Sequence, residues 1–213
     1  MTDGLNIKVL FQNLPINEKV NVITHGTGLL LSLLLCPLLL FSESLSLQFL
    51  GLCVFTFGLI FMFFSSTFYH LANKDVRKNR WRVVDHISIF FLIGGTYTPF
   101  ILFYYNTKEG LAFLLLHWMI IAGGVIFKLI FKTKYEIISL VLYLVLGWMV
   151  LFIYDEISKN MTGAVKFWLL AGGISYTIGV FFYVKTSIQW NHAIWHILVI
   201  LGGAGHFIAL LLS

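Results

Sequence analysis

Long apolar stretches alternate with short polar segments along the whole chain. Each stretch runs for about 20 residues, which is the length an α-helix needs to cross the hydrocarbon core of a bilayer. A membrane β-strand would instead alternate apolar with polar residues. The pattern therefore predicts seven transmembrane helices, at about 20–41, 47–71, 83–105, 110–131, 136–154, 164–184 and 191–212.

The segments between these stretches are too short to form another domain. We therefore expect an all-α polytopic protein with one membrane domain over residues 1–213. The first stretch is too long for the apolar part of a signal peptide, so we expect it to be retained as a span. Aromatic residues that suit the membrane interface lie near several predicted ends: Trp81, Tyr104, Tyr105, Tyr135, Tyr154 and Trp190.

The composition excludes several classes of protein. Hydrophobic residues make up 59% of the chain and charged residues only 11%, whereas about a quarter of a soluble domain is charged. A soluble enzyme, a disordered chain and a nucleic-acid-binding module are therefore excluded, and we expect a multi-pass protein of a cell membrane. The two cysteines, Cys36 and Cys53, lie in apolar stretches and are expected to be core residues.

The distribution of lysine and arginine predicts the orientation, because loops on the cytoplasmic side carry an excess of both. Eleven of these residues lie in the N-terminal segment and in the connections that follow the second, fourth and sixth spans. The connections on the other side of the membrane hold three. We therefore expect a cytoplasmic N-terminus and an external C-terminus, the reverse of a G-protein-coupled receptor. The last span contains no lysine for a retinal Schiff base. The richest connection is the expected loop 74–82, which we interpret as a determinant of topology.

Polar residues within membrane spans are costly and therefore indicate candidate functional sites. Four spans carry them near the end assigned to the cytoplasm, so they are expected to form one layer. Asp85 is expected in the first turn of its helix. The set comprises Glu18, Asn21 and His25 in the first span, Ser66 and His70 in the second, Asp85 in the third, and His192 and His196 in the seventh.

Three of these histidines suggest a metal site. His192 and His196 are four residues apart on one helix face, so both imidazoles can reach one ion. His70 would complete a three-histidine set for zinc, with an open position for a water that Asp85 orients and Ser66 supports. Glu18, Asn21 and His25 are candidates for the shell around these ligands.

A structural interpretation stays open for each of these residues. Polar side chains in membranes often hydrogen-bond between helices, and the histidines could do only that. Ser66 could bond a carbonyl of its own helix, and Glu18, Asn21 and His25 could cap a helix or link two helices. His117 and His206 lie toward the outer leaflet, where we expect packing or pathway residues more than ligands.

The same residues carry a family pattern. The sequence closely resembles the haemolysin III family, the bacterial branch of the progestin and adipoQ receptor (PAQR) family, from about residue 15 to the C-terminus. The motifs are Glu18-x-x-Asn21-x-x-Thr24-His25-x-x-Gly28, Ser66-Thr67-Phe68-Tyr69-His70, Asp85-His86, Gly95-Thr96-Tyr97-Thr98-Pro99, His192-Ala193-Ile194-Trp195-His196 and Gly205-His206-Phe207.

The resemblance implies seven helices, a cytoplasmic N-terminus and a zinc site near the inner leaflet. By motif the ligands would be His70, His192 and His196, with Asp85 and Ser66 beside the ion. The resemblance also implies kinship with alkaline ceramidase-type hydrolases, while bacterial members are associated with membrane fluidity and carry a label as cytolysins.

The main functional hypothesis is a zinc-dependent intramembrane hydrolase of lipid amides, or a factor in lipid homeostasis. Its partner would be a membrane lipid, such as a ceramide-like molecule or a fatty acid. The alternatives are a pore-forming cytolysin or channel, a sensor in which zinc is structural and, less favoured, proton-coupled transport along His25, Asp85 and His206. The sequence does not predict the oligomeric state.

Overall fold

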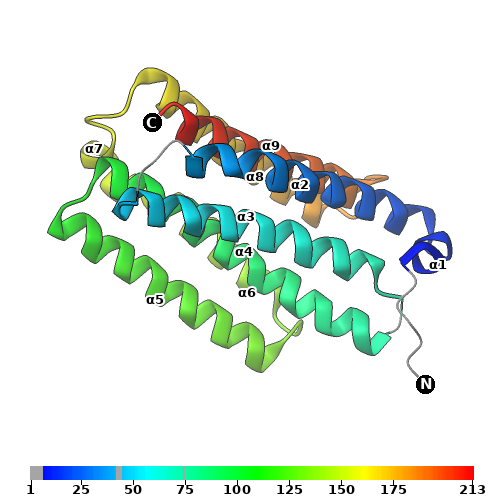
Figure 1. The fold of residues 1–213 in the computed structure, drawn as a ribbon. Helices are drawn as coiled ribbons and strands as arrows, with labels where there is room; N and C mark the ends of the chain where they lie inside the picture. Colours follow the sequence, from blue (N-terminus) through cyan, green and yellow to red (C-terminus); the bar gives the residue numbers. More distant parts are fainter. Residues whose placement is uncertain (1–6, 42–44, 74) are drawn as a thin grey trace.

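The computed structural model describes residues 7–41, 45–73 and 75–213, and Figure 1 shows a bundle of long helices that lie roughly side by side. Seven helical segments are long and apolar enough to cross a membrane, and the described residues contain no strand. The expected all-α, multi-pass membrane fold is confirmed. The spans are α2 (Ile16–Phe41), α3 (Leu47–Leu71), α4 (Asp75–Tyr104), α5 (Lys108–Phe131), α6 (Glu136–Trp148) with its continuation to Ile157, α8 (Gly163–Val184) and α9 (Asn191–Leu211).

The start of α4 differs from the prediction. Residues 74–82 were expected to be a loop, but the helix begins at Asp75, and Lys74 lies outside the described residues. A helix can continue into water because its own backbone satisfies its hydrogen bonds, and Lys and Arg are good helix formers. Asp85 therefore lies well inside α4 rather than in its first turn. A short helix that the apolar pattern did not predict, α1 (Ile7–Gln12), precedes α2.

Three spans begin at a hydroxyl residue that the sequence places just before the apolar stretch. The side-chain oxygens of Ser46, Thr107 and Thr162 accept hydrogen bonds from backbone N–H groups three residues later, at 3.1–3.2 Å. These bonds satisfy N–H groups that have no partner within the helix. They locate the first turns of α3, α5 and α8.

Small residues bring α3 and α4 into close contact. A Cβ atom added to Gly58 would lie 2.5 Å from the carbonyl oxygen of Phe91, and one added to Gly95 would lie 3.0 Å from that of Val54. Nearer the end of α3, the Ser65 hydroxyl donates to the Ser88 hydroxyl at 2.7 Å. Close backbone approach at small residues is a common basis of helix association in membranes. This interface holds the end of α3 against the first half of α4.

The fifth span is broken, although we expected one continuous helix. After α6 come a 3₁₀ turn, η1 (Met149–Ile153), and one α-helical turn, α7 (Tyr154–Ile157). An unbroken helix would join the Leu146 carbonyl to the Val150 amide. Instead, the Val150 amide donates to the Tyr97 hydroxyl at 2.7 Å, and the Leu146 carbonyl lies 3.3 Å from Nε2 of His117. A side chain inserted into the helical ladder is a known cause of such breaks.

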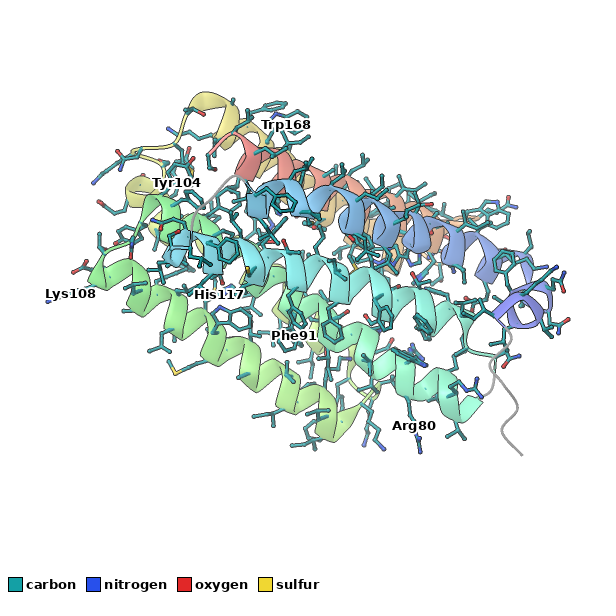
Figure 2. The ribbon with its side chains drawn as sticks, in the orientation of Figure 1. Arg80, Phe91, Tyr104, Lys108, His117 and Trp168 are labelled. Carbon is teal, nitrogen blue, oxygen red and sulfur yellow. The ribbon has the colours of Figure 1, made fainter. Side chains whose placement is uncertain are left out.

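The arrangement of the helices brings four ends together. In Figure 1, α2 and α4 begin at the end of the bundle where α3 finishes, and α9 packs against both α2 and α8. Figure 2 labels Arg80 at this end and Lys108 with Tyr104 at the opposite end. The end that carries Arg80 is therefore the one that contains the predicted polar layer.

Candidate metal centre

Three histidines from two distant parts of the chain meet at this end of the bundle. His70 lies in the last turn of α3, while His192 and His196 lie in the first turns of α9. One ring nitrogen from each lies within 4.8 Å of the other two, and the Nε2 atoms of His70 and His192 are 3.2 Å apart. The side chains of these three residues could hold a metal ion.

The local structure of α9 places two of these rings on one face. His192 and His196 are one helical turn apart, and their ring centroids are 4.6 Å apart. The Asn191 side chain donates to the carbonyl of Phe182 at 3.1 Å, which ties the start of α9 to the end of α8. Trp190, just before α9, has a left-handed backbone with φ of 63°. The chain therefore turns sharply before the two histidines.

The surroundings suit neutral imidazole ligands. His70 and His196 are 2% and 1% exposed, and burial away from water opposes a charged ring. Neutral imidazole nitrogens are good ligands for zinc, copper, iron and nickel. The chemistry of the donor set therefore fits a transition metal but does not by itself choose one.

The structure also brings Asp85 and Ser66 to the histidines. Ser66 is 2% exposed and lies on α3 one turn before His70. Asp85 and Ser66 line the same cavity as His192 and His196. A carboxylate and a hydroxyl are thus available beside the candidate ligands.

The predicted residues of α2 surround the cluster without joining it. The Nδ1 atom of His70 lies 2.6 Å from Oε2 of Glu18. His25 is 2% exposed, its ring stacks on His196 with centroids 3.5 Å apart, and both of its nitrogens lack a hydrogen-bond partner among the described residues. Asn21 is also buried, and its carbonyl oxygen lies 2.9 Å from the Thr24 hydroxyl oxygen.

Two further residues contact this group, and neither was expected there from the sequence. The Thr24 hydroxyl oxygen is 2.9 Å from Nδ1 of His196. The Lys78 ammonium donates to Oε1 of Glu18 at 2.6 Å. Thr24 adjoins His25 in the first motif, so a search for polar residues beside the histidines could have found it. Lys78 was counted only toward topology, and no sequence signal identified its partner.

A large, mainly apolar cavity is lined by two of the three histidines, His192 and His196. Its volume is about 900 Å³, at the upper end of the range for ligand sites. Its wall includes His192 and His206 of α9, which are about 20 Å apart at 1.5 Å per residue. His206 and His117 each place Nε2 at 3.3 Å from a backbone carbonyl, of Leu169 and Leu146 respectively. Each ring thus contacts a neighbouring helix, and neither belongs to the group of three candidate ligands.

The sequence also matches known proteins over most of its length. Residues 14–207 match the family described as "Haemolysin-III related". The chain is 34% identical to "Hemolysin-3 homolog" of Bacillus subtilis (strain 168), covering 91% of this chain and 92% of that protein. It is 32% identical to "Hemolysin-3" of Bacillus cereus, covering 91% and 90%.

An animal relative extends the similarity to the PAQR side of the family. The chain is 30% identical to human "Monocyte to macrophage differentiation factor" over 170 residues, which cover 74% of this chain and 67% of that protein. The resemblance inferred from the motifs is therefore confirmed. With its seven apolar spans and these matches, the chain belongs to the haemolysin III-related family of multi-pass membrane proteins.

Proposed function

We propose that this protein is a zinc-dependent intramembrane hydrolase of lipid amides. The observation that carries the proposal is the cluster of three imidazoles, two of which, those of His192 and His196, line a large apolar cavity together with Asp85 and Ser66. A metal site of this kind beside an apolar cavity suits a substrate with a reactive polar group and a long apolar chain.

The distance between the closest ring nitrogens is compatible with zinc. Zinc binds histidine nitrogen at 2.0–2.1 Å with tetrahedral geometry, so two ligand nitrogens should lie about 3.3 Å apart. The Nε2 atoms of His70 and His192 are 3.2 Å apart. Zinc also has no redox chemistry, which suits a hydrolase with three neutral ligands.

The ligands and the residues around them would have different roles in the reaction. When bound, zinc would supply a Lewis acid that polarises a carbonyl and activates water. The Asp85 carboxylate would orient the attacking water and accept its proton. Ser66, which lines the same cavity, would hold that carboxylate in place through its hydroxyl group, and His70, His192 and His196 would hold the ion.

The cavity indicates the class of substrate. It extends about 20 Å along α9, which is roughly two-thirds of a hydrocarbon core of about 30 Å. Its walls are mainly apolar and come from α4, α6, α8 and α9. An acyl chain of a ceramide-like lipid would lie along it, entering from the bilayer between helices, with the amide group next to the histidines.

Metal content and turnover of purified protein test the proposal together. We expect wild-type protein to contain one zinc ion per chain by elemental analysis and to release fatty acid from ceramides or other N-acyl lipids, measured by mass spectrometry. His192→Ala should lose both properties. Asp85→Asn should keep the metal and lose activity by at least about 10²-fold, as expected for a general base.

A control and three contrary outcomes complete the experiment. Glu156→Gln removes an exposed ion pair with Lys159 and should change neither property. Metal without turnover of any lipid amide would reject the hydrolase and favour a sensor with a structural ion. Turnover by metal-free protein would reject zinc. Dye leakage from liposomes without metal would instead favour the pore.

A further inference from the structure

We infer that α2, which provides none of the three candidate ligands, is the positioning helix of the metal site. Glu18, held by Lys78, and Thr24 would fix the rings of His70 and His196 so that Nε2 of each faces the ion. The inference rests on the proposed metal site and assigns roles around it. The hydrogen bonds at the other ring nitrogen of each histidine support it.

The contact with Glu18 determines the orientation of His70. A neutral imidazole has one N–H donor and one acceptor nitrogen. The Glu18 carboxylate accepts at Nδ1, with Oε2 at 2.6 Å, so the hydrogen belongs on Nδ1 and the lone pair on Nε2. Nε2 is also the atom that lies 3.2 Å from Nε2 of His192. The free lone pair of His70 therefore faces the candidate metal position.

Thr24 gives His196 the same orientation. The Thr24 oxygen lies 3.0 Å from the carbonyl oxygen of Val20 and 2.9 Å from that of Asn21. Because a hydroxyl has a single hydrogen, which one of these carbonyls takes, its oxygen is left to accept from Nδ1–H of His196 at 2.9 Å. The Nε2 lone pair is again the one left for the ion. The stacked ring of His25 limits rotation of His196.

Lys78 holds the Glu18 carboxylate from its other side. Its ammonium donates to Oε1 of Glu18 at 2.6 Å and lies 4.9 Å from the ring centre of Tyr69. The Glu18 side chain is 23% exposed and would otherwise be free to turn toward water. Both carboxylate oxygens are thus engaged, one by a candidate ligand of α3 and one by the start of α4. Lys78 should therefore act on the metal only through Glu18.

The expected magnitude follows from comparable sites. Partners that orient metal-bound histidines typically contribute 10–100-fold in metal affinity. Glu18→Ala removes the acceptor and should weaken binding by about that factor, while Glu18→Gln keeps a neutral acceptor and should weaken it less. Thr24→Val removes the hydroxyl with little change of shape and should also weaken binding. Thr24→Ser keeps the hydroxyl and should retain affinity close to wild type.

The test is a titration of metal-free protein in detergent with Co²⁺, followed by displacement with Zn²⁺ in a competing chelator. The visible spectrum of bound Co²⁺ reports ligand geometry, which a change in overall stability would not alter. We expect weaker affinity and an altered spectrum in Glu18→Ala and Thr24→Val. Lys78→Met should weaken binding in wild type but add nothing in Glu18→Ala, because the two residues act in series.

A matched control separates this effect from a general loss of charge. Glu136 is another carboxylate in a short ion pair, 2.6 Å from Arg82, and Glu136→Gln should leave affinity and spectrum unchanged. If Glu18→Ala does not fold, Glu18→Gln and Thr24→Val carry the test. Wild-type affinity and spectrum in the α2 variants, with loss of metal in His70→Ala, would overturn the inference alone. A wild-type protein that binds neither metal would overturn the proposed function as well.

Discussion

The break in the fifth span gives a quantitative prediction about stability. Tyr97→Phe removes one hydroxyl group and keeps the aromatic ring. That hydroxyl donates to the carbonyl of Gly147 at 2.9 Å and accepts from the amide of Val150 at 2.7 Å. Both backbone groups belong to the segment where α6 gives way to η1, and this segment forms part of the cavity wall.

The cost can be worked from these two bonds. Hydrogen bonds between membrane helices contribute about 0.6 kcal/mol on average and up to about 1.7 kcal/mol. A backbone group left without a partner away from water costs about 1–3 kcal/mol. Two such bonds, at about 0.6–1.7 kcal/mol each, total about 1–3 kcal/mol, so we expect Tyr97→Phe to lower the free energy of unfolding by about that amount.

Tyr143→Phe is the matched control. Its hydroxyl makes one bond, to the carbonyl of His86 at 2.7 Å, and His86 lies within α4, where the helix provides its carbonyl with another partner. Unfolding in detergent, followed by circular dichroism during titration with a denaturing surfactant, should show a larger loss for Tyr97→Phe. Equal stability of Tyr97→Phe and wild type, or a larger loss for Tyr143→Phe, would refute the account of the break.

Three further predictions use other features. Gly58→Ala should destabilise the protein by about 1–3 kcal/mol through overpacking, because the added Cβ would lie 2.5 Å from the carbonyl oxygen of Phe91. A Cβ added to Gly123 would have nothing within 4 Å, so Gly123→Ala should be neutral or stabilising in the same unfolding assay. Removing metal with a chelator should lower the melting temperature of wild type but not of a variant without one ligand histidine. The predicted topology can be tested with an impermeant thiol reagent in a background without native cysteines. The reagent should label Lys159→Cys in intact cells but Lys134→Cys only after permeabilisation. The opposite pattern would show that the N-terminus lies outside the cell.

The spans were predictable because lipid imposes a simple rule on them. Every backbone group must be satisfied within the membrane, so length and apolar content alone locate a helix such as α3 (Leu47–Leu71), whose ends match the prediction. The rule does not apply where a helix leaves the bilayer, so the early start of α4 at Asp75 was missed. It also did not reveal the break after Trp148, because the side chains that allow it come from α4 and α5.

The site was partly predictable for a related reason. Counting residues from the end of each span placed His70 and His192 at one depth, and the structure brings their Nε2 atoms to 3.2 Å. Depth does not specify which side chain contacts which. The pairing of Glu18 with His70, and of Lys78 with Glu18, depends on how α2, α3 and α4 are rotated about their axes.

The same cost that makes polar residues rare in membranes explains why those present here form one connected group. A polar atom facing lipid lacks a partner, so the residues of α2, α3, α4 and α9 must satisfy one another inside the bundle. Glu18, Thr24 and Lys78 do so around the histidines. His25 differs from these three, since neither of its nitrogens has a partner among the described residues. Its burial against His196 therefore depends on ring stacking and on Phe63, whose ring meets it edge-on at 5.3 Å.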